Sequence, residues 1–218
     1  MRGAAEVAFR LGVAGVSIER VRAVSGASRS QVYRFFPAKE ALIDAVVDFR
    51  IAAVLDRQRS LLASMDSPGD LQEWADGVVE LNRARKGSRG CPLGSLVSQL
   101  AEQSGAIRAK LEDAFQTWQS YLAAGLRRMQ DRGELSAEAD VDELATGVVA
   151  ALQGGLILAQ AARSEKPLRA ALDLAIGRVA LAAPPLTSHA PATSESGQAS
   201  AAAPNTSDVG RPRSKKQP

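Results

Sequence analysis

The sequence has very few cysteine, histidine and aromatic residues, and these shortages exclude several kinds of site. Its 218 residues include one cysteine, Cys91, and one histidine, His189, and only 4% of them are aromatic. A lone cysteine excludes an intramolecular disulfide, and a lone histidine leaves almost no material for a catalytic dyad or a histidine-based metal site. We therefore expect no catalytic residues, no metal site and no cofactor.

Long apolar runs and targeting segments are also lacking. The N-terminal residues have neither the length nor the flanks of a signal peptide, and the most apolar stretch, GVVAALQGGLILAQAA, is interrupted by Gln153 and Gln160. Neither a secretory signal nor a membrane span is predicted. Together with the single cysteine, this pattern favours a soluble cytoplasmic protein.

Helix-forming residues dominate what the sequence does contain. Apolar residues make up 45% of the chain and are largely Ala, Leu and Val, whereas segments with the period of a β-strand are scarce. We therefore predict an all-α fold of about nine helices. The expected helices cover roughly residues 2–11, 18–25, 28–36, 37 onward, 70–86, 95–103, 104–132, 140–163 and 167–183.

Positive charge is concentrated at the two ends of the chain. Residues 1–50 carry 8 basic side chains against 5 acidic ones, and residues 51–183 carry 15 against 17. Within residues 19–39 the balance is 5 to 1. Such an asymmetry is expected of a surface that meets a polyanion, although a solvated face of the protein gives the same pattern.

The stretch ASRSQVYRFFPAKEAL, residues 27–42, lies in this basic region and follows a short predicted helix that ends at Gly26. Ser28 and Gln31 have the spacing of a capping box, which starts a second short helix, and Pro37 must end it. Two short helices joined by a turn that contains glycine form a helix-turn-helix unit. The predicted partner is therefore double-stranded DNA.

The side chains of the second helix and of the start of the next one divide into two groups by their length. Its first turn holds Arg29, Ser30 and Gln31, the residue types that contact base edges in the major groove. The longer side chains of Tyr33, Arg34 and Lys39 suit phosphate groups, as does the N-terminus of the next helix. Base contacts would specify the DNA sequence, and phosphate contacts would set the register.

The segment GASRSQVYRFFPAKEALIDAV resembles the recognition segment of TetR-family transcriptional repressors, and the resemblance extends back to cover residues 4 to about 47. Ser17 and Tyr33 correspond to phosphate contacts of that family, Lys39 to its phosphate-binding lysine, and residues 28–34 to its base-reading helix. The segment GCPLGSLVSQL is similar to one in the LmrA and YxaF branch. The expected DNA-binding residues are thus Ser17, Ser28, Arg29, Ser30, Gln31, Tyr33, Arg34 and Lys39.

The sequence departs from this family at two points. Ser30 stands where the family often has glycine, which changes the expected base contacts. Family members also carry several residues, often basic, before the first helix, whereas this chain begins almost inside it. Either the first turn of that helix is missing here or the natural start lies upstream.

The resemblance implies a ligand-responsive repressor with three parts, namely a DNA-binding domain at 1–47, a ligand-binding and dimerisation domain at 48–183 and a tail at 184–218. The tail lacks apolar periodicity and is expected to be disordered. The candidate ligand-binding residues are Cys91, Trp118, Tyr121 and Leu122. For the aromatic residues the alternative is an ordinary core position, and for Cys91 it is a redox sensor or a small buried side chain.

The resemblance also implies a homodimer whose last two long helices, at 140–163 and 167–181, form a four-helix bundle with a second copy. The first of these helices is apolar on more than one side, and a stripe on it recurs at helical spacing. The residues of this expected dimer interface are Val148, Leu152, Leu156 and Ala159. The rival function is an all-α enzyme or scaffold with an incidental basic N-terminal face.

Overall fold

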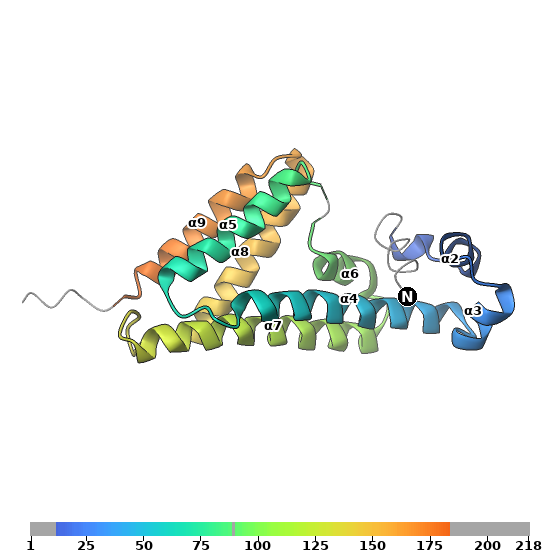
Figure 1. Cartoon of the computed structure of the whole chain (residues 1–218), viewed down its shortest axis with the longest axis horizontal. Coiled ribbons are helices and arrows are strands. Elements are labelled where there is room, and N and C mark those ends of the chain that lie inside the picture. The colour runs from blue at the N-terminus through green and yellow to red at the C-terminus, as the bar shows by residue number, and fades with distance from the viewer. Residues whose placement is uncertain (1–11, 89, 184–218) are drawn as a thin grey trace, which may run out of the picture. The chain divides into compact units, whose positions relative to one another are not determined.

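The computed structural model describes residues 12–88 and 90–183, and all regular secondary structure in this part of the chain is helical, as predicted (Figure 1). The predicted helix at 2–11 and the predicted tail from 184 lie outside the described residues. The described elements are the 3₁₀ helix η1 (Val13–Gly15) and the α-helices α2 (Ile18–Ser25), α3 (Arg29–Phe35), α4 (Lys39–Leu62), α5 (Pro68–Ala84), α6 (Pro92–Leu100), α7 (Gly105–Asp131), α8 (Val141–Ala162) and α9 (Lys166–Ala180).

The N-terminal elements have a small core of their own. It joins α2, α3 and Val16, the residue after η1, to the first turns of α4, and its other buried residues are Ile18, Val21, Val32, Leu42 and Val46. Gly26 ends α2 in the left-handed conformation, with φ of 70°, which a glycine adopts without strain. We call η1, α2, α3 and the start of α4 the N-terminal unit.

Helices α4 and α7 lie side by side, and α7 holds α4 near both of its ends (Figure 1). Near the start of α4, the Lys110 ammonium donates to Asp44 at 2.7 Å and to Asp48 at 2.8 Å. Beyond the other end, the Arg128 guanidinium donates to the Leu62 and Met65 carbonyls at distances from 2.7 to 3.1 Å. These contacts fix the long helix that leaves the N-terminal unit.

Helices α8 and α9 form the most extensive helix pair of the described chain. The Asp140 carboxylate accepts from two backbone amides and starts α8, next to the predicted helix start at residue 140. Gly155 allows the close packing of α9, because a Cβ there would lie 2.9 Å from the Leu168 Cα. By length and composition α8 is apolar enough to cross a membrane, but eight of its residues are buried within the protein.

Candidate nucleic-acid interface and ligand cavity

Helix α3 is exposed on every side except the one that faces the small N-terminal core. Only Val32 of this helix is buried. Phe36, the residue that caps its C-terminal end, packs against the same core. Tyr33 is 39% exposed and Phe35 is 72% exposed, so neither side chain is used by the core. A short helix anchored by one apolar residue leaves its remaining side chains available to a partner.

A capping box fixes the start of α3, which confirms the prediction from sequence. The Gln31 amide donates to the Ser28 hydroxyl at 3.2 Å, and the Ser28 amide donates to Gln31 Oε1 at 2.8 Å. The Ser30 hydroxyl lies 3.1 Å from that of Ser28. The cap therefore uses the carbonyl of the Gln31 side chain, and a bidentate contact with adenine would have to compete with it.

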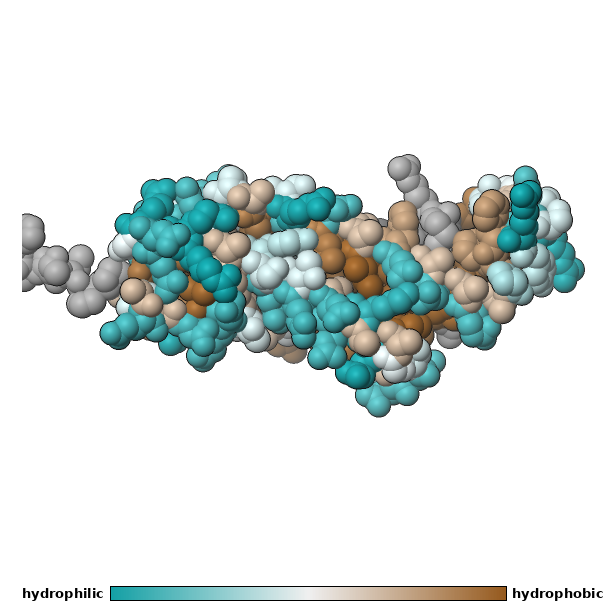
Figure 2. Space-filling model, turned by 90° about the horizontal axis from the view of Figure 1, so that it is seen from below, coloured by the Kyte–Doolittle hydropathy of each residue, from teal (hydrophilic) through white to brown (hydrophobic). Residues whose placement is uncertain are grey.

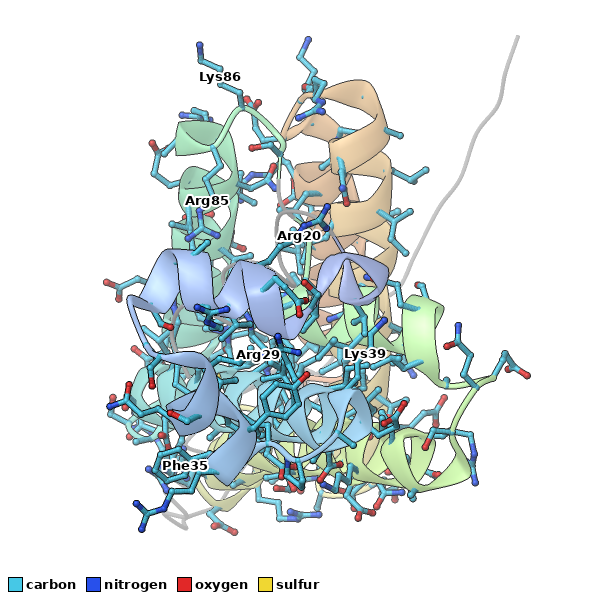
Figure 3. All side chains as sticks on the ribbon, turned by 90° about the vertical axis from the view of Figure 1, so that its right-hand side faces the viewer. Arg20, Arg29, Phe35, Lys39, Arg85 and Lys86 are labelled. Carbon is cyan, nitrogen blue, oxygen red and sulfur yellow. The ribbon has the colours of Figure 1, made fainter. Side chains whose placement is uncertain are left out.

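Arg29 and Tyr33 form a pair on the exposed surface of α3. The Arg29 guanidinium carbon lies 5.4 Å from the centre of the Tyr33 ring, within the range of a cation–π contact. Figure 3 views this end of the protein and labels Arg20 of α2, Arg29 and Phe35 of α3 and Lys39 of α4. Lys39 is the first, exposed residue of α4, and the preceding Ala38 has no side chain that can cap the helix amides.

Ser17 and Arg20 organise the start of α2. The Ser17 hydroxyl accepts from the Arg20 amide at 3.3 Å, and the Arg20 guanidinium donates to the Gly15 carbonyl at 2.9 Å. Hydrogen bonds from its own backbone amide and from Ser17 lower the pKa of the Glu19 carboxyl. Ser17 therefore already has a structural role, and a phosphate contact would add to it.

A cavity of about 920 Å³ lies in the part of the chain that follows the N-terminal unit. Its lining comes from α4, α5, α7 and α8, from the segments on either side of α5, and from the start of α6. Of the predicted ligand residues, Cys91 and Trp118 line this cavity, whereas Leu122 is fully buried in the core and Tyr121 packs against that core. Within the described residues, no group of His, Cys, Asp or Glu has an arrangement that could hold a metal ion.

The cavity wall contains three residues that the sequence analysis missed. The Trp74 indole donates to Gln58 Oε1 at 3.1 Å, and both side chains are buried. Asn82, also buried, belongs to the apolar face of α5 together with Leu71 and Trp74. A polar residue at an apolar position of a helix was the available signal for Asn82.

Burial sets the chemistry of Cys91, which precedes α6 and is 8% exposed. Desolvation raises the pKa of its thiol, and hydrogen bonds from the backbone amides of Gly94 and Leu93 oppose this shift only in part. The thiol is therefore protonated at neutral pH and a poor nucleophile. This finding favours a cavity-lining side chain over a redox sensor.

The structure buries most of the predicted dimer stripe inside the protomer, so this stripe is not the exposed patch that we expected. Val148, Leu152 and Ala159 are at most 1% exposed, and Leu152 and Leu156 line the cavity. Helices α7 and α9 pack against α8 and cover this face. The large apolar residues of α8 and α9 that are exposed are Ile157, Leu158, Leu174 and, just after α9, Leu181.

Comparisons with known proteins agree with this architecture. The family model for "Bacterial regulatory proteins, tetR family" matches residues 1–46, and the one for "Tetracyclin repressor-like, C-terminal domain" matches residues 70–175. The transcriptional regulator AcuR of Cereibacter sphaeroides is 30% identical over 162 residues, which cover 72% of this chain and 73% of AcuR.

Two further relatives are more distant. The uncharacterised HTH-type transcriptional regulator YxaF of Bacillus subtilis is 26% identical over 66% of this chain and 74% of its own length. The crystal structure of a regulatory protein TetR from Rhodobacter sphaeroides matches with a TM-score of 0.71 at 21% identity, covering 81% of this chain and 94% of that one. The similarity to YxaF is not close enough to assign this chain to that branch.

Proposed function

Because this chain belongs to the TetR family of DNA-binding transcriptional regulators, and is thus not an enzyme, we propose that it is a ligand-responsive repressor that binds a palindromic operator as a homodimer. The observation that carries the proposal is the exposure of α3 on a separate small core, where only Val32 is buried. Such a helix can enter the major groove without disturbing the fold that supports it. The expected location is the cytoplasm, where the DNA is.

The DNA-binding residues have two roles in this proposal. Arg29, Ser30 and Gln31 read base edges from the first turn of α3. The contacts to phosphate groups come from Ser17, Tyr33, Arg34 and Lys39. Ser28 acts through the cap that holds the first turn of α3 in place.

The effector would act through α4, which is continuous from the DNA-binding surface to the cavity. Its first residue is Lys39, and its residues from Arg50 to Leu61 contribute to the cavity wall. A ligand that binds one orientation of α4 more tightly shifts the protein toward that orientation. In a dimer, the two recognition helices then no longer match half-sites spaced about 34–36 Å apart.

A gel-shift assay with the DNA that flanks the gene tests this proposal. We expect a shift that survives a large excess of unrelated DNA. The bound protein should also protect a two-fold symmetric site from nuclease. In cells that produce the protein, expression of a reporter gene fused to the promoter should be repressed, and the effector should restore that expression. A protein that gives no sequence-preferring shift at any salt concentration would not be a repressor of this kind.

A further inference from the structure

Among the residues that the structure describes, the buried part of the cavity wall contains no charged side chain. Every described charged residue that lines the cavity is partly or fully exposed, so these charges lie toward its edge. Apart from the apolar side chains, the described residues of the buried wall offer two carboxamides, two indoles and one thiol. The buried lining residues are Gln58, Met65, Trp74, Asn82, Cys91, Trp118 and Leu152.

Two acidic residues at the edge of the cavity, Asp70 and Asp76, already have partners. Asp70 accepts from the backbone amides of Asp66 and Ser67 at 3.0 and 3.1 Å, as part of the cap of α5. The Arg169 guanidinium pairs with Asp76 and lowers the pKa of that carboxyl.

The remaining charges at the edge are of both signs and are mostly in interactions already. Glu80 pairs with Arg83 at 3.0 Å, and the lining residues Arg50 and Arg85 also have interaction partners. Among the described lining residues this leaves Arg57 and Glu73, one of each sign, and both side chains are exposed to solvent. A charged ligand in the buried part of the cavity would therefore lose its hydration and find no counter-charge among the described buried residues.

Two polar atoms of the buried wall have no hydrogen-bond partner within the described structure. They are the indole nitrogen of Trp118, on α7, and Oδ1 of Asn82, on α5. The Trp74 indole, in contrast, is satisfied by Gln58. Buried polar groups without partners are uncommon in proteins, and a bound molecule is one source of the missing hydrogen bonds.

We propose that the effector is an uncharged, mainly apolar molecule that contains a ring and carries at least one hydroxyl or carbonyl group. Its oxygen accepts from the Trp118 indole, or its O–H or N–H donates to Asn82 Oδ1, while the ring packs against Trp74, Met65 and Leu152. This inference rests on the proposed effector role of the cavity. It adds the chemical class of the ligand and the residues that select it.

The chain supplies its own probe for the test. Trp74 and Trp118 are its only tryptophans, and both line the cavity, so tryptophan fluorescence of the full-length protein reports occupancy without DNA. Three compounds with the same ring and chain should be compared near neutral pH, namely 4-phenylbutan-1-ol, 4-phenylbutanoate and 4-phenylbutylammonium. Calorimetry on the same samples gives the dissociation constants.

We expect the dissociation constant of the alcohol to be lower than that of either ion by a factor of about ten or more. Either ion binding as tightly as the alcohol, or no binding by any of the three at millimolar concentration, overturns the proposal. Trp118→Phe keeps a ring but removes the indole N–H, and should weaken binding of the alcohol about five- to tenfold. Trp74→Phe is the matched control, because its N–H is already used by Gln58, and should weaken binding less.

Asn82→Asp provides an independent test, because it introduces a charge at nearly unchanged volume. This variant should shift the preference from the alcohol toward the ammonium compound, and an unchanged order of affinities in a folded variant contradicts the assignment of Asn82. Circular dichroism verifies the fold of each variant. The gel-shift assay with the wild-type protein is run in parallel. If that protein binds no operator, the proposed repressor function is refuted. If it binds the operator but prefers a charged compound, only the proposed ligand class is refuted.

Discussion

Lys39 and Lys166 offer a matched comparison of two exposed lysines, because each is the first residue of a helix. Lys39 lies in the proposed DNA-binding surface, and Lys166 begins α9. We expect Lys39→Ala to weaken binding to all DNA sequences alike and to reduce the slope of log affinity against log salt by about 1, since a phosphate contact carries no base identity. Lys166→Ala should leave the slope unchanged, and equal effects of both variants would contradict the assignment.

Arg29 and Tyr33 are in contact but have different proposed roles, so their variants should differ in kind. Arg29→Ala removes a base-reading side chain and should cost about 1–3 kcal/mol of discrimination at particular base pairs. Tyr33→Phe keeps the ring under Arg29 and removes only the hydroxyl, so it should lower affinity evenly and leave base preference intact. Binding to a set of operators with single base-pair changes measures both. An Arg29→Ala protein with full base preference would show that Arg29 is not a reader.

Single residues were predictable from the sequence where the cause is local. The Ser28 and Gln31 cap depends on residues three positions apart, and the structure contains it. The positions of Gln58 and Asn82 in the cavity wall depend instead on which helices pack around the cavity, and no local sequence pattern specifies this packing. Tyr121 and Trp118 lie on the same helix at helical spacing, yet only Trp118 lines the cavity.

Helix α6 connects the cavity to the N-terminal unit. Cys91 and Pro92, at its start, line the cavity, and Gln99, near its end, accepts a hydrogen bond from the Val13 amide at 2.7 Å. The Gln99 amide group also donates to the carbonyl and the hydroxyl of Ser95 at 2.9 and 2.8 Å. The Gln99 carboxamide is therefore held in one orientation by its own helix while it binds the N-terminal unit.

We expect Gln99→Leu to weaken the coupling between effector and DNA. The variant leaves the partly buried Val13 amide without its acceptor, so the N-terminal unit loses a contact with α6. The ratio of operator affinities without and with effector should fall, while effector affinity measured without DNA stays the same. Gln103→Leu, an exposed glutamine just after α6, is the control. An unchanged ratio of operator affinities for Gln99→Leu would show that this contact of α6 does not couple effector binding to DNA binding.

Helix boundaries followed from the sequence more reliably than helix packing. Gly26, Pro37 and Asp140 mark chain positions where backbone chemistry requires an end or a start, and the structure has its boundaries at or next to them. The stripe predicted as a dimer interface was a real apolar face of α8. Periodicity identifies such a face but does not indicate whether α9 of the same chain or a second copy covers it.

In the molecule as a whole, apolar surface remains after the described helices have packed. Ile157, Leu158 and Leu174 are 64%, 59% and 78% exposed. Figure 2 shows one face, seen from below, on which apolar patches interrupt the polar surface. One α3 helix of seven residues contacts too few base pairs to single out a site in a genome, so the proposed operator mechanism needs a second copy.

We expect this second copy to bind through the exposed apolar residues of α8 and α9. Leu174→Glu, or Ile157→Glu, would place one carboxylate on each side of a two-fold interface. Neither carboxylate would have a counter-charge, so the dimer should dissociate. Because both side chains are exposed in the protomer, the substitutions should leave the fold of each chain intact. Size-exclusion chromatography with light scattering measures the mass, and circular dichroism verifies the fold.

Phe35→Glu is the control for this experiment, since Phe35 is 72% exposed but lies on α3, away from the proposed interface. It should leave the mass of the dimer unchanged. Leu174→Glu should lose specific operator binding although every proposed DNA-binding residue is intact, because a monomer contacts only one half-site. A wild-type protein that is monomeric at micromolar concentration with and without DNA, or a Leu174→Glu protein that remains dimeric, would place the interface elsewhere.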